Sequence, residues 1–161
     1  MIAVSDTSPV CYLILIGKVD LLRERFSSVL VPRAVVAELL HEDAPENVRA
    51  WAASLPSWIS VHDNPSGPMV GMEKLQAGEQ NAILLAELVK ADIILLDEKS
   101  ARRVAADRGL HVTGTLGVVG EAATRGRVDL IEALDLLRKT NFRYSPALLK
   151  ATLDRFGPKE Q

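Results

Sequence analysis

Two aspartates, Asp6 and Asp97, each follow a short apolar segment and could work together in chemistry that needs carboxylates. Asp6 ends the segment 2–6, and Asp97 follows four consecutive apolar residues at 93–96. If both segments are parallel strands, their carboxyl ends meet at one edge of a sheet, where sites of such proteins collect. Each aspartate alone is equally well explained as a helix N-cap. The presence of both aspartates at one edge favours a functional site over two separate caps.

Two glutamates are further candidates, and each has an ordinary structural explanation. Glu38 falls at the rim of a helix face that Val35 and Leu39 mark as buried, and helical spacing does not distinguish it from Glu42. Glu79 stands at the start of a helix, where the helix dipole favours a carboxylate. The residue pattern alone therefore leaves both glutamates open.

Carboxylates gathered at one edge would suit a divalent cation. Mg²⁺ and Mn²⁺ prefer oxygen ligands, and such an ion lowers the pKa of bound water and neutralises charge on a phosphodiester. The hydroxyls of Ser8 and Thr115 could orient a carboxylate or a water, or could cap helices. His41, His62 and His111 lie in separate segments, which argues against a zinc site.

The elements that must position these side chains alternate along the chain. Strands are predicted at 2–6, 29–31, 58–61, 92–97 and 111–113. Helices are predicted from Ser8–Pro9 to Leu15, at 19–26, from Pro32 to about Glu42, at 45–54, 78–90 and 99–108, and from 116, 129 and 145; residues 63–68 form a loop. This order predicts an α/β fold with a mainly parallel sheet.

Length and composition predict one cytoplasmic domain spanning residues 1–161, with a helical tail at 141–161. The chain is 48% hydrophobic, yet its apolar runs are too short to cross a bilayer, so no membrane association is expected. We expect no secretory signal at the start of the chain. The single cysteine, Cys11, forbids an internal disulfide and suits a reducing compartment.

Charge and aromatic content limit how nucleic acid could be bound. The net charge of −2 argues against a general, non-specific nucleic-acid binder but does not exclude a nuclease, because bound metal ions offset acidic ligands. Aromatic residues make up 4% of the chain, too few for a long base-stacking platform. Lys99, Arg102 and Arg103, close after Asp97, are the preferred candidates for phosphate contacts. Arg143 belongs to a second basic group with Arg125, Arg127, Arg138 and Lys139.

Five segments in order carry a resemblance to a known family. They are Val-Ser-Asp-Thr-Ser-Pro at 4–9, Val-Pro-Arg-Ala-Val-Val-Ala-Glu-Leu at 31–39, Gly-Glu-Gln-Asn-Ala-Ile at 78–83, Leu-Leu-Asp-Glu at 95–98 followed by Ala-Arg at 101–102, and Gly-Thr-Leu-Gly-Val at 114–118. The chain resembles the PIN-domain ribonucleases over about residues 1–140, and most closely the VapC-like toxins of prokaryotic toxin–antitoxin modules. The resemblance implies a PIN-like α/β/α sandwich.

The resemblance also assigns the acidic residues. It places the metal-binding and catalytic acids on Asp6, Glu38, Glu79 and Asp97, with Mg²⁺ or Mn²⁺ as cofactor, and so prefers Glu38 to Glu42. Many PIN domains have aspartate where this chain has Glu79. The longer side chain could hold the metal differently, and Glu98 could substitute for it or add a ligand.

The function implied by the resemblance is metal-dependent hydrolysis of RNA by a toxin. Such toxins are held inactive by a small antitoxin protein and commonly form homodimers. The alternative is a catalytically inactive PIN-like module that binds RNA or protein. An aspartyl-phosphate mechanism is disfavoured because Ser8 stands where a second aspartate would be needed.

Overall fold

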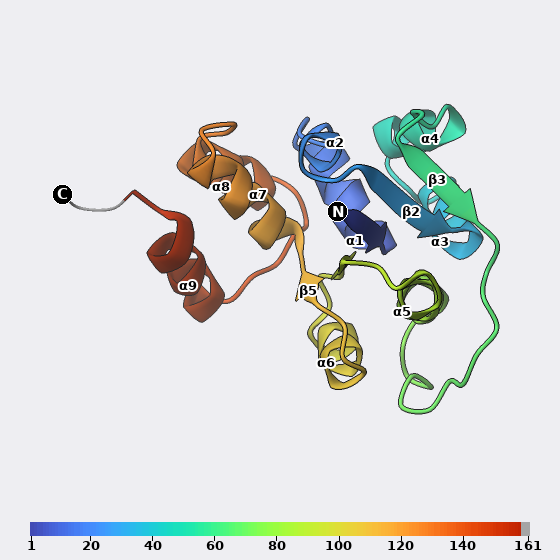
Figure 1. Ribbon diagram of the computed structural model, residues 1–161. Coiled ribbons are helices and arrows are strands. Elements are labelled where there is room, and N and C mark those ends of the chain that lie inside the picture. Colours follow the sequence, from blue (N-terminus) through green and yellow to red (C-terminus); the bar gives the residue numbers. More distant parts are fainter. Residues whose placement is uncertain (159–161) are drawn as a thin grey trace.

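A five-stranded parallel sheet lies at the centre of the protein (Figure 1). In this computed structural model, residues 1–158 are described. The strands are β1 (Ile2–Ser5), β2 (Ser28–Pro32), β3 (Ile59–His62), β4 (Ile93–Leu95) and β5 (Val112–Thr113). They are ordered β3-β2-β1-β4-β5, and every neighbouring pair is parallel.

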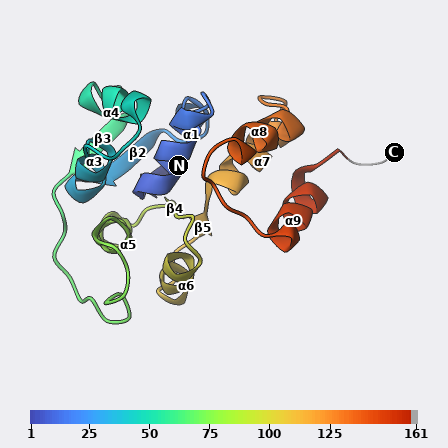
Figure 2. The same ribbon diagram turned by 180° about the vertical axis from the view of Figure 1, so that it is seen from behind.

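Helices cover both faces of the sheet, which confirms the predicted α/β/α sandwich (Figures 1 and 2). One layer contains α5 (Ala77–Val89) and α6 (Lys99–Asp107). The other contains α1 (Thr7–Leu15), α2 (Leu21–Arg25), α4 (Glu46–Ala53) and α7 (Thr115–Thr124), with α8 (Leu130–Arg138) and α9 (Pro146–Phe156) packed against α7. Helix α3 (Arg33–Leu39) contacts both α1 and α5. Among residues 1–158 no helix is long and apolar enough to span a membrane.

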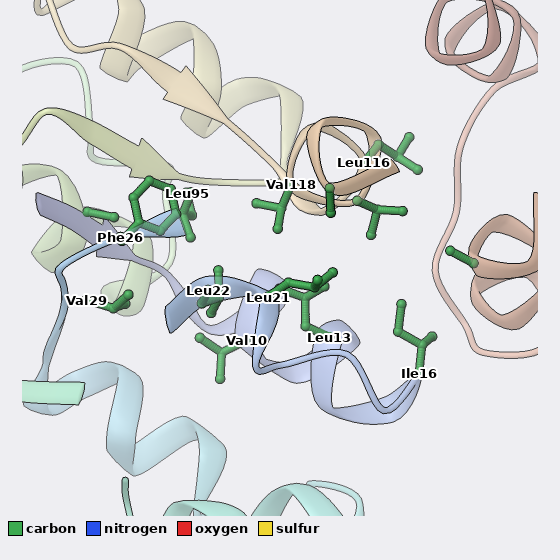
Figure 3. Close-up of a cluster of buried hydrophobic side chains, with 14 of the residues drawn as sticks. Val10, Leu13, Ile16, Leu21, Leu22, Phe26, Val29, Leu95, Leu116 and Val118 are labelled. Atoms are coloured by element: carbon green, nitrogen blue, oxygen red, sulfur yellow. The ribbon is translucent and has the colours of Figure 1, made fainter. Parts of the chain in front are cut away.

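Strand side chains alternate between two hydrophobic clusters, one on each face. Ala3 and Leu95 belong to the cluster under α1 and α7, whereas Val4 and Ile94 belong to the cluster under α5 and α6. Figure 3 shows the first cluster, where side chains of α1, α2 and α7 converge. Because both faces are buried, the strands read as continuous apolar runs in the sequence.

Two predicted helix boundaries were wrong. Helix α1 begins at Thr7, with Asp6 rather than Ser8 at the N-cap position; Pro9 is tolerated there because the first four helical amides have no partner within the helix. Helix α3 ends at Leu39, before Glu42. A local turn competes with the helix, since the His41 ring accepts a hydrogen bond from the Asp43 amide at 3.1 Å.

The C-terminal helix α9 packs against α7 (Figure 2). A side chain at Gly120 would stand 2.2 Å from Phe156 Cδ2, so glycine permits this close approach. Leu149 and Leu153 pack against the core, whereas Leu148 is 46% exposed. Within the predicted tail at 141–161, helix α9 thus packs on the fold up to Phe156, and residues 159–161 lie outside the described part.

Candidate active site

Asp6 and Asp97 lie at the ends of the two adjacent central strands. Strands β1 and β4 pair with Ser5 opposite Leu95. The Asp6 amide continues this pairing by donating to the Leu95 carbonyl at 3.1 Å. The carboxyl edge of the sheet therefore presents both aspartates, and the helices that follow each strand start there.

Asp6 occupies the N-cap position of α1 without acting as a cap. Its side chain makes no capping hydrogen bond. The residue is only 6% exposed, and within residues 1–158 its Oδ1 atom is buried without a hydrogen-bond partner. A buried carboxylate oxygen without a partner is costly, so it needs an explanation beyond helix capping.

Glu38 faces the same small space as this oxygen. Its Oε1 accepts a hydrogen bond from the Gly78 amide at 3.1 Å, and its Oε2 accepts one from the Thr7 hydroxyl. A Cβ added to Gly78 would stand 2.8 Å from both Glu38 oxygens and 2.9 Å from Asp6 Oδ1. The space between the two carboxylates is open because residue 78 has no side chain. Glu42, by contrast, is exposed.

Asp97 is held by protein donors. The Thr115 amide donates to Oδ1 and the Thr115 hydroxyl to Oδ2, both at 2.7 Å. Arg102 Nη1 donates to the Leu96 carbonyl at 2.9 Å and lies near Asp97 Oδ1, since both stand 2.7 Å from the position of a Cβ on Gly114. Both oxygens of Asp97 therefore have partners.

Glu79 is buried, at 7% exposed, and serves the start of α5. Its Oε1 accepts a hydrogen bond from the Gln76 amide at 3.0 Å, as one half of a capping box. Glu98 is exposed at the N-cap position of α6, close enough for its charge to raise the pKa of Glu79. Glu79 therefore stabilises the start of α5, as its position predicted. Its negative charge also contributes to raising the pKa of Asp6.

The four predicted acids share one electrostatic environment. Burial raises the pKa of Asp6 to about 7; the Thr7 amide opposes this shift, and the charges of Glu79, Glu38 and Asp97 add to it. Burial is also the first cause that raises the pKa of Asp97 and of Glu79. The site is short of positive charge near Asp6.

These residues fit a divalent cation that keeps part of its water shell. Within residues 1–158 there is no group of three or more His, Cys, Asp or Glu side chains arranged to hold a metal ion. Mg²⁺, however, is commonly bound through one or two carboxylates together with waters and substrate phosphates. The orphaned oxygen of Asp6 and the facing carboxylate of Glu38 provide such a pair.

Of the remaining predicted residues, some contact the acids and others do not. Thr115 contacts Asp97, whereas in the described part of the chain the Ser8 hydroxyl makes no hydrogen bond to any of the four acids. Thr7, which donates to Glu38, was missed; its place directly after the strand-end aspartate was the available signal. Lys99 and Arg103 are exposed, but Arg102 is turned inward to Leu96.

A parallel sheet between two helix layers, with acidic residues at its carboxyl edge, defines the class of protein: an α/β/α protein with an acidic site. The sequence model of a family described as PIN domain matches residues 2–158. The chain belongs to the PIN-domain family, as its resemblance predicted. Proteins of this family are generally nucleases and typically use divalent metal ions. A comparison with curated proteins gave no match.

Proposed function

We propose that this protein is a Mg²⁺- or Mn²⁺-dependent endoribonuclease that hydrolyses RNA phosphodiester bonds as the toxin of a toxin–antitoxin pair. The observation that supports the metal-dependent activity is the orphaned, buried Oδ1 of Asp6, which shares a small space with Glu38. A divalent cation between them would supply the missing partner and offset the burial of the charge.

Each residue has a role that follows from its contacts. Asp6 and Glu38 would hold the cation, and the Thr7 hydroxyl orients Glu38. Asp97 is fixed by Thr115 and would bind a water of the metal shell or a second ion. The bound ion supplies a water of lowered pKa and neutralises phosphate charge. Lys99 and Arg103, which are exposed, would contact the RNA backbone outside the acids.

The decisive experiment compares Asp6→Asn with the wild-type chain on labelled single-stranded RNA of mixed sequence, with Mn²⁺ or with EDTA. The wild type should cleave only with metal, and Asp6→Asn should lose at least about 1,000-fold of that rate, because a metal ligand acts in every turnover. Asp107→Asn, at an exposed position in α6, is the matched control and should cleave like the wild type. Undiminished cleavage by Asp6→Asn would overturn the proposal.

The toxin assignment has a separate test in cells. Expression of the wild type in a bacterial host should arrest growth, whereas Asp6→Asn should not. Co-expression of a small antitoxin protein encoded beside the gene should restore growth. The homodimer that the family resemblance implies is tested by light scattering on the purified chain. Unimpaired growth with abundant active wild type would remove the toxin role and leave the ribonuclease.

An inactive PIN-like binding module is the second candidate, and one observation favours it. Among the described residues no three side chains form a ready metal cage, and Glu79 is occupied by the start of α5. Calorimetric titration with Mn²⁺ separates the two functions. Heat that depends on Asp6 supports the nuclease, and the absence of any binding supports the module.

A further inference from the structure

The connection between α8 and α9, residues 139–145, is fastened to helix α1. The Tyr12 hydroxyl donates to Asn141 Oδ1 at 2.9 Å. The Tyr12 ring meets Phe142 edge-on with centroids 4.8 Å apart, and Phe142 contacts Tyr144 at 5.9 Å. Figures 1 and 2 both show this connection running past the start of α7 and the end of β5.

Aromatic residues are concentrated in this corner. The chain has two Tyr, three Phe and two Trp, and both tyrosines and one phenylalanine are found here. All three rings are partly buried, so they pack the connection against α1 as well as facing solvent. The aromatic contacts and the Tyr12 hydrogen bond together fix the backbone on both sides of residue 143.

Arg143 stands between Phe142 and Tyr144 in the sequence, and its side chain is exposed. Within residues 1–158 it forms no salt bridge, in contrast to Arg108, which pairs with Glu87 at 2.9 Å. Tyr12 lies in the field of both Asp97 and Arg143: burial is the main cause that raises the pKa of its phenol, Asp97 adds to the shift and Arg143 opposes it. The connection 139–145, which includes Arg143, runs past the start of α7, where Thr115 holds Asp97, so this segment passes beside the β4 half of the acidic edge (Figures 1 and 2).

A further cation would complement Lys99 and Arg103, because the third predicted phosphate contact, Arg102, serves another purpose. The Arg102 guanidinium donates to the Leu96 carbonyl and stands beside Asp97. An RNA strand crossing the acidic edge meets several negative carboxylates, so its backbone requires cations outside them. Arg143 is presented by a fastened connection, which lowers the entropy lost when its side chain binds.

We propose that Arg143 binds the RNA backbone next to the reacting phosphate, and that Tyr12 positions it by fastening residues 141–142 to α1. This inference rests on the proposed ribonuclease function. Arg143 contributes binding that is the same in the ground state and the transition state. Its loss therefore changes KM and leaves kcat nearly unchanged.

The test uses the full chain and labelled single-stranded RNA of mixed sequence. Arg143→Gln should raise KM about 5- to 10-fold, with kcat within about 2-fold of the wild type. Binding of the same RNA, measured by anisotropy with Ca²⁺ in place of Mg²⁺, should weaken equally. The slope of log K against log salt should fall by about 0.7, the value for one lost contact to a single strand. Arg143→Lys should recover most of the binding.

Control and coupling variants separate binding from a merely structural role. Arg23→Gln changes an exposed arginine of α2 that pairs with Asp20 at 3.6 Å, and should alter neither KM nor the salt slope. Tyr12→Phe, which removes only the hydroxyl, should raise KM less than Arg143→Gln. In the Arg143→Gln background Tyr12→Phe should add nothing, because Tyr12 acts through Arg143.

The possible outcomes distinguish failure of this inference from failure of the proposed ribonuclease function. A wild type that cleaves while Arg143→Gln matches it in KM and salt slope overturns this inference alone. A wild type that binds RNA without cleaving, with a weakened Arg143→Gln, overturns the nuclease and supports the contact. A wild type that neither binds nor cleaves RNA overturns both.

Discussion

The two halves of the acidic site lie at the ends of neighbouring strands, but their aspartates differ in their hydrogen-bond partners. In the β4 half, Asp97 accepts two hydrogen bonds from Thr115 at 2.7 Å and lies near Arg102. In the β1 half, Asp6 Oδ1 is buried without a hydrogen-bond partner among the described residues. A protein group that satisfied Asp6 would occupy the place of a cation, so the unsatisfied half marks where we expect the ion.

The largest expected effect is on stability, and it compares a substitution at Asp6 with the same substitution at Asp97. Without metal at pH 8, Asp6→Asn should raise the free energy of unfolding by about 2 to 4 kcal/mol, because it removes a buried charge whose Oδ1 atom has no hydrogen-bond partner in the described part of the chain. Asp97→Asn should gain less than Asp6→Asn, because asparagine cannot accept both Thr115 hydrogen bonds as the carboxylate does. Urea unfolding in EDTA measures both variants. A larger gain at Asp97 would reverse the assignment of the two halves.

The second expected effect is a pH dependence that Asp6 imposes on the metal-free protein. The pKa of Asp6 is about 7 in the folded state against 3.8 for a free carboxyl, so the folded state holds this proton more tightly than the unfolded state. Its contribution to stability is present at low pH and is lost as the pH rises from about 4 to 7. Between pH 5 and pH 8 the loss should be about 2 to 3 kcal/mol.

Comparison with Asp6→Asn isolates that contribution. The free energy of unfolding, measured with urea in EDTA, should fall more for the wild type than for the variant over this pH range. At pH 8, Mn²⁺ should restore stability to the wild type by mass action and leave Asp6→Asn nearly unchanged. Parallel pH profiles of the two chains would contradict the shifted pKa.

The third effect concerns the glycine beside each aspartate, which is Gly78 in the Asp6 half and Gly114 in the Asp97 half. The three atoms nearest to a methyl at Gly78 would be side-chain oxygens of Glu38 and Asp6, at 2.8 to 2.9 Å, and none of them belongs to the backbone. Gly78→Ala should therefore fold normally but lose about 10- to 100-fold in Mn²⁺ affinity by calorimetry, as a displaced ligand does. A methyl at Gly114 would stand 2.9 Å from the Leu96 carbonyl of the backbone, so Gly114→Ala should lower the melting temperature instead. Unchanged Mn²⁺ binding by Gly78→Ala would place the ion elsewhere.

The smallest effect concerns how Asp97 is held. Thr115→Val keeps the shape of this fully buried residue but removes the hydroxyl that donates to Asp97 Oδ2. We expect about 1 to 2 kcal/mol of lost stability in urea unfolding and about 10-fold slower RNA cleavage. Thr115→Ser retains the hydroxyl and should recover most of the activity. Equal activity of the valine and serine variants would show that Asp97 needs no such orientation.

The positions of Asp6 and Asp97 could be read from the sequence because strand ends are local features. Continuous apolar runs predict strands buried on both faces, and parallel strands bring their carboxyl ends to one edge. The order of strands and helices was predictable for the same reason. The helix boundaries near Thr7 and Leu39 were less predictable, because several polar residues could occupy the N-cap position of α1 and a local turn at His41 competes with the end of α3.

The amino-acid sequence by itself determined the α/β architecture and the two aspartates at the edge of the sheet. Tertiary structure decided which partners the acids have. Helical periodicity treats Glu38 and Glu42 alike, yet only Glu38 meets the amide of Gly78, 40 residues further along the chain. The inward turn of Arg102 and the orphaned oxygen of Asp6 likewise depend on packing between distant segments. A residue pattern fixes the face on which a side chain lies, and only the assembled fold fixes what that side chain meets there.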